Sequence, residues 1–318
     1  MGSGVSTPVP HLSIIALPLL RGRKGGSVPA GLVLMQLLNG LVVGMIYVLV
    51  TMGLTIVFGM LNVINFAHGA FYALGAYLAF SVATLIGSWS GSFWVAVLIA
   101  PLVVGLVGAV IEVTLVRRMY DVVHEYQILL TFGVMLVIQE LIIMIWGPIG
   151  KSVPMPSQLV GVIDLGVFAF PIYRIFLIIF IALVCFGVWL LIEKTSYGAI
   201  IRAGIDNRDM VNCLGIDIYK AFTIVFAFGV SLAGLGGVLV LPMRGAQPLM
   251  GDTILLLAFV VLVIGGMGSF AGAILGGLLV GVVESMMILI WPQGSMISIF
   301  AAMALVILIR PKGLLGYR

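Results

Sequence analysis

The chain has 318 residues, of which 63% are hydrophobic and only 8% are charged, and its formal net charge is +4. A soluble domain carries roughly a quarter charged residues, so this composition excludes an ordinary soluble enzyme and indicates a polytopic helical membrane protein. The charge does not indicate nucleic-acid binding, and the two cysteines, Cys185 and Cys213, give neither a disulfide framework nor a metal cluster. We therefore predict an all-α fold.

The first 30 residues match neither a membrane span nor a signal peptide. The apolar stretch at residues 12–20 is too short to span a bilayer, and Arg21, Arg23 and Lys24 follow it, whereas a signal peptide begins with its charges. We interpret residues 1–30 as an N-terminal extension that is peripheral or disordered. Residues 31–318 then form the membrane domain.

Long apolar runs in the membrane domain predict about eight transmembrane helices. The run at residues 253–291 is too long for one span and contains the glycine turn 265–269, so we interpret residues 253–264 as a half-helix and the remainder as a span. The other spans are expected at residues 31–60, 70–86, 93–116, 126–146, 171–192, 221–241 and 295–309. Broken or re-entrant elements are thus expected near residues 61–69 and 253–269.

The first of these interruptions reads NVINFAHG from residue 62, and neither flank carries Lys or Arg. A cytosolic loop between spans usually has one. Uncharged polar backbone at membrane depth is tolerated where protein or a water-filled cavity covers it, which favours a broken element lining a path. The alternative is a tight turn at either surface, with Asn65 as a helix N-cap.

Basic residues between spans predict the orientation. Arg117 and Arg118 place the third joint in the cytoplasm, and the basic residues of 193–220 and 310–312 agree. The proline-rich loop 147–171 is then outside. This orientation also places the N-terminus outside, whereas the positive charges at residues 21–24 would favour the cytosolic side. Either those charges belong to a flexible tail, or the first 90 residues contain one more crossing.

Residues 193–220 form a polar island that carries eight of the 26 charged residues. Within it, apolar residues at positions 200, 203, 210 and 214 follow a helical spacing, and residues 202, 206 and 209 form a polar stripe. The pattern predicts a short amphipathic helix ended by Gly215. It is either a solvated linker between spans or a docking helix for a cytosolic partner.

Enzymatic signals are missing. Residues Gly150 to Ser152 match the end of a phosphate-binding loop. However, Ile145 occupies the position of that motif's first glycine, and no predicted strand precedes the segment. The three histidines show no metal-ligand spacing. We predict no catalytic residue and no metal site.

Glu140 and Glu284 are the clearest ionisable residues inside predicted spans. Each is explained by snorkelling or by one hydrogen bond to a neighbouring helix. A proton or cation pathway would need several converging carboxylates. A path lined by Asn, Ser, Gly and apolar residues suits a small polar or zwitterionic solute with an apolar part.

Four stretches together resemble a known family. They are the run from residue 37 that contains INFAHG, the loop YGAIIRAGIDNRDMVNCLGI, the stretch LVIGGMGSFAGAILGGLLVGVVES and the C-terminal RPKGLLG. From about Gln36 to its end, the chain resembles the permease subunits of branched-chain amino acid ABC importers that pair two different permeases. Residues 1–30 have no match in the family pattern.

The resemblance implies a multi-pass protein of the bacterial inner membrane that carries branched-chain amino acids, or a related small amide, amino acid or aromatic acid. Its expected partners are a second permease subunit, cytosolic ATPase subunits, a periplasmic solute-binding protein and the lipid bilayer. No cofactor is expected in this chain, because ATP and Mg²⁺ would be bound by the partner ATPase. The alternative is a stand-alone secondary transporter or channel for a small neutral solute such as urea, with Glu140 or Glu284 needed for coupling.

Two groups of residues are predicted to carry the function. The loop 193–220 would be the coupling segment that docks on the ATPase, through Gly198, Arg202, Ala203, Asp206, Asn207, Leu214, Gly215 and Ile216. The translocation path is predicted to lie near Asn39, Asn65, Phe66 and His68.

Overall fold

The computed structural model describes residues 30–316 apart from residues 88, 121, 165 and 167. The predicted extension therefore lies outside the described residues, except Ala30, which begins the first helix. The long helices are α2 (Ala30–Leu61), α3 (His68–Ile86), α4 (Trp89–Thr114), α5 (His124–Trp146), α6 (Ile172–Lys194), α9 (Ile218–Arg244), α11 (Phe270–Ile290) and α12 (Ser295–Ile309).

The remaining elements are α7 (Ser196–Asp206), α8 (Arg208–Cys213), α10 (Met250–Gly265), the 3₁₀ helices η1 (Val116–Met119), η2 (Ser157–Leu159) and η3 (Pro292–Gly294), and the strands β1 (Val162–Asp164) and β2 (Ala169–Pro171). In the described part of the chain, eight helices are long and apolar enough to cross a membrane. The prediction of an all-α multi-pass membrane protein with about eight spans is confirmed.

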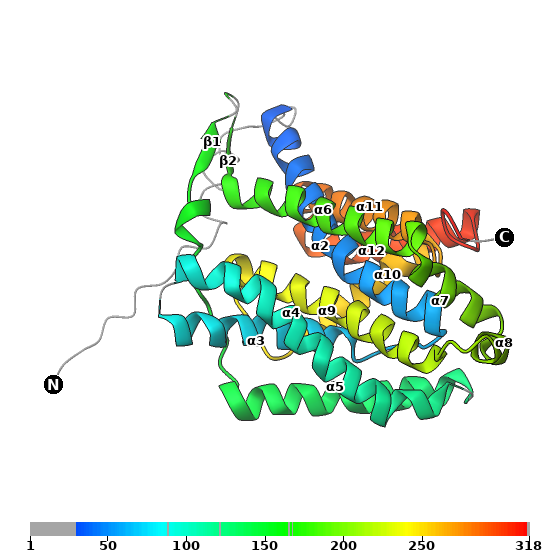
Figure 1. Ribbon diagram of the computed structural model, residues 1–318. Helices are drawn as coiled ribbons and strands as arrows, with labels where there is room; N and C mark the ends of the chain where they lie inside the picture. The colour runs from blue at the N-terminus through cyan, green and yellow to red at the C-terminus, as the bar shows by residue number, and fades with distance from the viewer. Residues whose placement is uncertain (1–29, 88, 121, 165, 167, 317–318) are drawn as a thin grey trace.

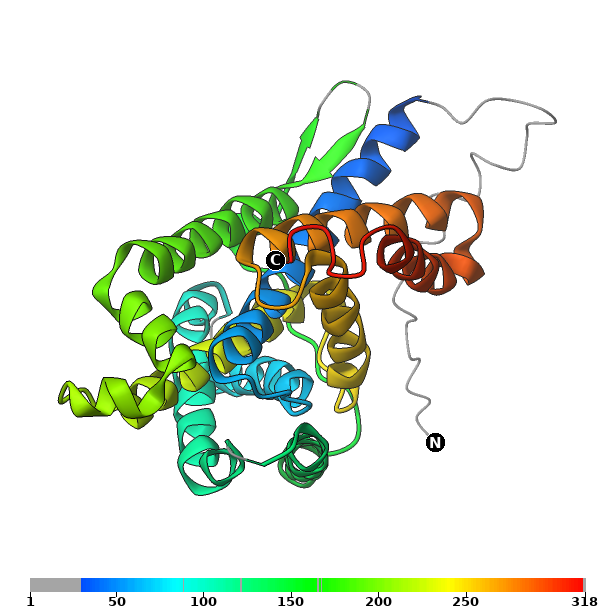
Figure 2. The ribbon, with the colours of Figure 1, turned by 90° about the vertical axis from the view of Figure 1, so that its right-hand side faces the viewer.

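Helix α2 passes through the middle of the bundle (Figure 2, blue) and is its most buried span, with 83% of its most apolar window covered by protein. It packs mainly against α11 and α9, and α9 packs in turn against α3 and α4. Small residues let these helices approach closely. A side chain at Gly53 would overlap the backbone of Gly229.

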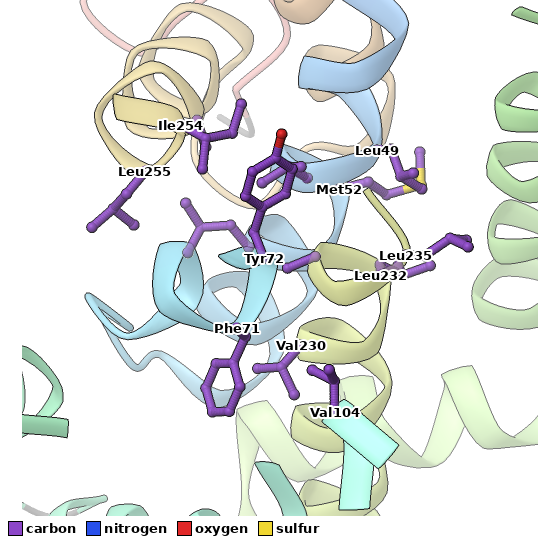
Figure 3. Packing of buried hydrophobic residues seen from close by; sticks show 14 of the residues in the cluster. Leu49, Met52, Phe71, Tyr72, Val104, Val230, Leu232, Leu235, Ile254 and Leu255 are labelled. Atoms are coloured by element: carbon purple, nitrogen blue, oxygen red, sulfur yellow. The ribbon is translucent and has the colours of Figure 1, made fainter. Parts of the chain in front are cut away.

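Apolar side chains from α2, α3, α4, α9 and α10 meet between these helices and form the core. Figure 3 shows Phe71 of α3 beside Val230 of α9 and Val104 of α4, all buried. The Phe71 ring also makes an edge contact with Phe226, with centroids 6.5 Å apart. Burial inside protein distinguishes α2 and α9 from α5 and α12, whose apolar side chains are largely exposed.

The interruption predicted at residues 61–69 lies inside the bundle. Helix α2 ends at Leu61, and α3 begins at His68, whose Nε2 lies 2.9 Å from the Val50 carbonyl oxygen. Val50 precedes Leu61 by eleven residues, so α3 begins roughly 16 Å inward from the end of α2. The broken element is confirmed. A tight surface turn capped by Asn65 is wrong, because the N-cap residue is Ala67 and no side chain caps it.

The second interruption separates α10 from α11. The backbone of Gly251 in the first turn of α10 contacts that of Gly69 in the first turn of α3. The two helices thus begin at the same depth. Helix α10 ends at Gly265, whose carbonyl accepts a hydrogen bond of 3.0 Å from the N–H of Leu315. The predicted half-helix is confirmed and is 16 residues long.

The bundle has two distinct ends (Figure 1). At the basic end lie η1, α7, α8 and the C-terminus, and the opposite, hairpin end carries the antiparallel strands β1 and β2. The sequence did not predict this hairpin. Described basic residues at the basic end are Arg117, Arg118, Lys194, Arg202, Arg208, Lys220, Arg310 and Lys312, against Lys151, Arg174 and Arg244 at the hairpin end. By the positive-inside rule the basic end faces the cytosol.

Candidate coupling surface and translocation path

The predicted coupling segment leaves α6 through a tight joint. A side chain at Gly198 would overlap the carbonyl oxygen of Ile192, so only glycine fits there. The Nη1 of Arg202 donates a hydrogen bond of 2.8 Å to the same carbonyl. A cation at a helix C-terminus also interacts favourably with the helix dipole. Arg202 therefore holds α7 against the end of α6.

The segment consists of two helices rather than the single amphipathic helix predicted. Helix α7 ends at Asp206, and Asn207 is extended, with φ −155° and ψ 101°. The Oδ1 of Asn207 accepts a hydrogen bond of 2.9 Å from the N–H of Met210 and so caps α8. This local bond competes with continued helix. Gly215 ends the segment as predicted, with φ +81°.

The apolar stripe of the segment is exposed except at Ile200, which is half-buried. The side chains of Met210 and Leu214 are 60% and 72% exposed, and Ala203 is exposed as well. Ile201 and Val211 are buried against the bundle instead. Exposed apolar residues grouped at the basic end are typical of a surface that binds a partner. Of the other predicted coupling residues, Ile216 is half-buried, and the side chain of Asp206 lies outside the described part.

A buried carboxylate lies behind this surface. Glu112 is fully buried near the end of α4. Its oxygens accept hydrogen bonds of 2.7 Å from the hydroxyls of Tyr120 and Thr223, and of 3.1 and 3.3 Å from Arg117. We call Glu112, Arg117, Tyr120 and Thr223 the Glu112 network. It joins α4 and α9 at the basic end.

The Glu112 network also reaches the coupling segment. The guanidinium of Arg208, the first residue of α8, lies 5.2 Å from the ring centroid of Tyr120 and 5.6 Å from that of Phe222 on α9. Burial and the hydrogen bond to Glu112 raise the pKa of the Tyr120 hydroxyl. It therefore stays protonated and keeps its bond. A displacement of α8 would thus act on α4 and α9 through one set of contacts.

Helix α9 begins at a polar cap that faces the same surface. The Oδ1 of Asp217 accepts a hydrogen bond of 3.2 Å from the N–H of Lys220. Its other oxygen lies 3.1 Å from the Lys220 ammonium. These bonds hold the pKa of Asp217 below its usual range. The carboxylate is therefore charged at neutral pH, and a negative charge is stabilising at a helix N-terminus.

Three of the four predicted path residues come together in the interior. The Phe66 N–H lies 3.1 Å from the Thr131 hydroxyl on α5, and its ring lies 5.2 Å from that of Phe259 on α10. Asn65 and His68 are fully buried. Neither side-chain atom of Asn65 has a hydrogen-bond partner among the described residues. Such a group marks a place where water, a ligand or another state supplies the partner.

Asn39 lies apart from these three, eleven residues before Val50 on α2 and so roughly 16 Å nearer the hairpin end. Its Oδ1 accepts a hydrogen bond from Arg174 on α6, and its amide donates to Gln36 at 3.2 Å. Of the two intramembrane glutamates, Glu284 accepts a bond of 2.7 Å from Tyr47, and Glu140 is exposed on α5. The one-bond explanation of Glu284 is confirmed.

Two cavities lie on either side of the central part of α2. The outer cavity, of about 270 Å³, lies between α2, α3, α9 and α10, and its lining includes Tyr47, Tyr72 and Arg244. The inner cavity, of about 440 Å³, is lined by Thr55 and Asn62, by Arg202 of the coupling segment, and by the turn after α10. Thr51 lies between the two cavities and is buried.

Sequence reasoning missed the Glu112 network and the outer cavity. The signal for the first was available in part, because a glutamate and an arginine five residues apart stand where α4 ends. Thr223 is 111 positions away, and no local pattern indicates it. Among the described residues, no group of three or more His, Cys, Asp or Glu side chains could hold a metal ion.

Comparison with known proteins gives consistent matches. A family model described as "Branched-chain amino acid transport system / permease component" matches residues 36–309. The chain is 31% identical over 293 residues to the high-affinity branched-chain amino acid transport system permease protein BraD of Pseudomonas aeruginosa, covering 89% of this chain and 95% of BraD. No solved structure matches.

Two further relatives are named LivH. The chain is 29% identical over 303 residues to the high-affinity branched-chain amino acid transport system permease protein LivH of Escherichia coli, covering 89% of this chain and 95% of that protein. A probable branched-chain amino acid transport permease protein LivH of Methanocaldococcus jannaschii is 28% identical over 248 residues, 75% of this chain and 76% of the relative.

Proposed function

Because the chain belongs to the family of permease components of branched-chain amino acid transport systems, we propose that it is a membrane subunit of an ATP-driven importer for branched-chain amino acids. It works beside a second permease in the bacterial inner membrane. A periplasmic binding protein delivers the solute at the hairpin end. ATPase subunits, which bind ATP and Mg²⁺, dock at the basic end.

The observation that carries this proposal is the coupling segment α7–α8. It presents exposed apolar side chains at the basic end and is tied to the membrane helices by three separate contacts. Arg202 contacts the end of α6, Arg208 contacts the Glu112 network, and Gly204 packs against Ile218 of α9. A solvated linker would need none of these contacts. A segment that transmits movement from a partner needs all of them.

The two cavities support transport by alternating access. The outer cavity lies toward the hairpin end and the inner cavity toward the basic end, and buried residues of α2 separate them. The inner cavity includes Arg202, so a displacement of the coupling segment would change the cavity directly. The partner's ATP hydrolysis would then be linked to opening at the cytosolic side.

The test is reconstitution with partners. The chain should co-purify with an ATPase and a second permease when co-expressed with neighbouring reading frames. In vesicles the complex should take up leucine, isoleucine or valine only with ATP and a binding protein. Uptake by this chain alone, driven by a solute gradient, would instead support a secondary transporter or channel for a small neutral solute.

The docking surface has its own test, in which Leu214→Asp is expected to release the ATPase from the purified complex. Leu214 is 72% exposed, so the change removes little contact within the chain. Ile149→Asp is the matched control, because Ile149 is 76% exposed at the hairpin end and should keep the ATPase. Arg202→Glu should also uncouple hydrolysis from uptake. Normal ATPase retention in Leu214→Asp would contradict docking at this surface.

A further inference from the structure

The outer cavity is lined by both polar and apolar side chains. The polar ones are Tyr47 of α2, Tyr72 of α3, Arg244 at the end of α9, Gln247 and Thr253, and the apolar ones include Val240, Ile254 and Leu257. Figure 3 shows the Tyr72 ring pointing from α3 toward the side where Ile254 lies, with its hydroxyl oxygen outermost. The cavity thus combines polar and apolar surfaces within reach of one small molecule.

Arg244 supplies a cation without a fixed partner. Among the described residues its guanidinium has no hydrogen bond or ion pair. It lies within electrostatic reach of the Tyr47 and Tyr72 hydroxyls. Nearby Arg174 is already bonded to Asn39. An unpaired guanidinium at a cavity is suited to a carboxylate, which it binds through two parallel hydrogen bonds.

Tyr47 provides a hydrogen-bond acceptor for a positively charged group of the ligand. Its hydroxyl donates a hydrogen bond of 2.7 Å to the Oε2 of Glu284 on α11. Because its proton is directed to the carboxylate, the phenolic oxygen keeps its lone pairs for a donor in the cavity. The negative carboxylate behind it strengthens such a bond to an ammonium group. The acidic residue nearest to Arg244 in the sequence, Asp252, is already hydrogen-bonded to Gln139.

The volume of the outer cavity and its apolar lining limit the kind of ligand further. A volume of about 270 Å³ is near the lower end of ligand cavities, which hold about 300–1,000 Å³. A single amino acid fits this size better than a peptide. The branched aliphatic residues of the lining, Val240, Ile254 and Leu257, would cover an aliphatic side chain of the ligand.

We propose that the outer cavity binds a free aliphatic α-amino acid, with its carboxylate at Arg244, its ammonium at the Tyr47–Glu284 pair and its side chain against Val240, Ile254 and Leu257. This inference rests on the proposed import of branched-chain amino acids and adds a binding site within the permease. The permease would then bind the solute selectively after the binding protein releases it.

The experiment measures equilibrium binding of radiolabelled L-leucine to the purified, nucleotide-free importer complex, with the binding protein left out. Saturable binding is expected. Leucinamide, which lacks the carboxylate, and 4-methylpentanoate, which lacks the ammonium, should compete at least about 10-fold more weakly than isoleucine, because each leaves a charged group of the site unpaired.

Variants locate the site. Arg244→Gln should weaken leucine binding about 10-fold or more, and Tyr47→Phe should weaken it several-fold. Lys151→Gln is the matched control: Lys151 is also basic and at the hairpin end, but it does not line the cavity, so binding should be unchanged. Retained ATPase activity and an unchanged elution volume show that each variant is folded.

The outcomes separate this inference from the proposed function. Wild-type binding in Arg244→Gln, or equal competition by leucinamide, overturns the site. A complex that imports leucine with ATP but binds no free leucine overturns the site alone and leaves the importer standing. A complex with no ATP-dependent uptake overturns the proposed function.

Discussion

Glu112 is a single carboxylate on which three helical elements depend. It is fully buried and accepts hydrogen bonds from Arg117, Tyr120 and Thr223. A buried charge is stabilising only when its partners are all in place, because otherwise its lost hydration is not replaced. At this site the partners come from η1, from the residue after it and from α9.

We therefore predict that Glu112→Gln lowers the free energy of unfolding by about 1–3 kcal/mol, since the charge-assisted bonds are lost at nearly constant volume. Thermal unfolding in detergent, followed by tryptophan fluorescence, measures the change. Glu125→Gln serves as the control, because Glu125 is exposed at the start of α5. Equal melting temperatures for the two variants would contradict the structural role of the network.

At the scale of residues, the sequence predicted some positions and not their partners. Arg202 was predicted as a coupling residue, but its bond to the Ile192 carbonyl depends on how α7 folds back on α6. Asn65, Phe66 and His68 were predicted near a translocation path, and the structure places Asn65 and His68 in the buried interior. Arg244 and Tyr47 were not singled out, because they are 197 positions apart in the chain (244 − 47) and no local pattern connects them.

At the scale of elements, the break between α7 and α8 shapes the coupling surface. Asn207 caps α8 and directs Met210 and Leu214 outward. Without the cap, the Met210 N–H would lose its side-chain acceptor and the orientation of α8 relative to α7 would no longer be fixed by this bond. The exposed apolar stripe would then rotate relative to the bundle.

Asn207→Ala should cost about 0.5–2 kcal/mol of local stability through the lost cap. It should lower the amount of leucine taken up per ATP hydrolysed, while uptake without ATP stays absent. Asn207→Ser is the conservative control, because serine also caps helices. If uptake per ATP is the same in both variants and in the native chain, the break has no part in coupling.

The extent of the membrane elements was predictable, since an apolar run of a given length specifies a span regardless of its neighbours. Predicted and observed boundaries of α6 and α12 nearly coincide. The hairpin β1–β2 was not predictable, because its two strands have three residues each and lie in a loop with proline and glycine. The break at Asn207 was missed because the apolar positions 200, 203, 210 and 214 keep a helical spacing across it, although asparagine favours N-caps over helix interiors.

At the scale of the whole molecule, the two cavities lie toward opposite ends of the bundle, with buried residues of α2 between them. The chain has only two cysteines, Cys185, which is buried, and Cys213, which is exposed. A Cys213→Ser background therefore allows single cysteines to be placed at chosen depths. Their reaction with a membrane-impermeant maleimide reports which side each position faces.

We expect Thr253→Cys in the outer cavity to react only from the outside and Met267→Cys at the inner cavity only from the cytosolic side. Thr51→Cys, which is buried between them, should react from neither side in the nucleotide-free complex. Right-side-out vesicles expose the outer face of the protein to the maleimide, and inside-out vesicles expose its cytosolic face. Labelling of Thr253→Cys from the cytosolic side alone would reverse the orientation given by the positive-inside rule.

The deep start of α3 also constrains the order of events during synthesis. Residues 63–67 are buried or half-buried, and the backbone of Ile64 and Phe66 bonds to Thr131, 65 residues further along the chain than Phe66. At about 5–20 residues per second, the ribosome needs several seconds to add that stretch. No lysine or arginine occurs between residues 25 and 116 to anchor the nascent chain in the meantime. The backbone groups of Ile64 and Phe66 therefore lack these native partners until α5 has been made, so the broken element cannot reach its final bonding while α2 to α4 stand alone.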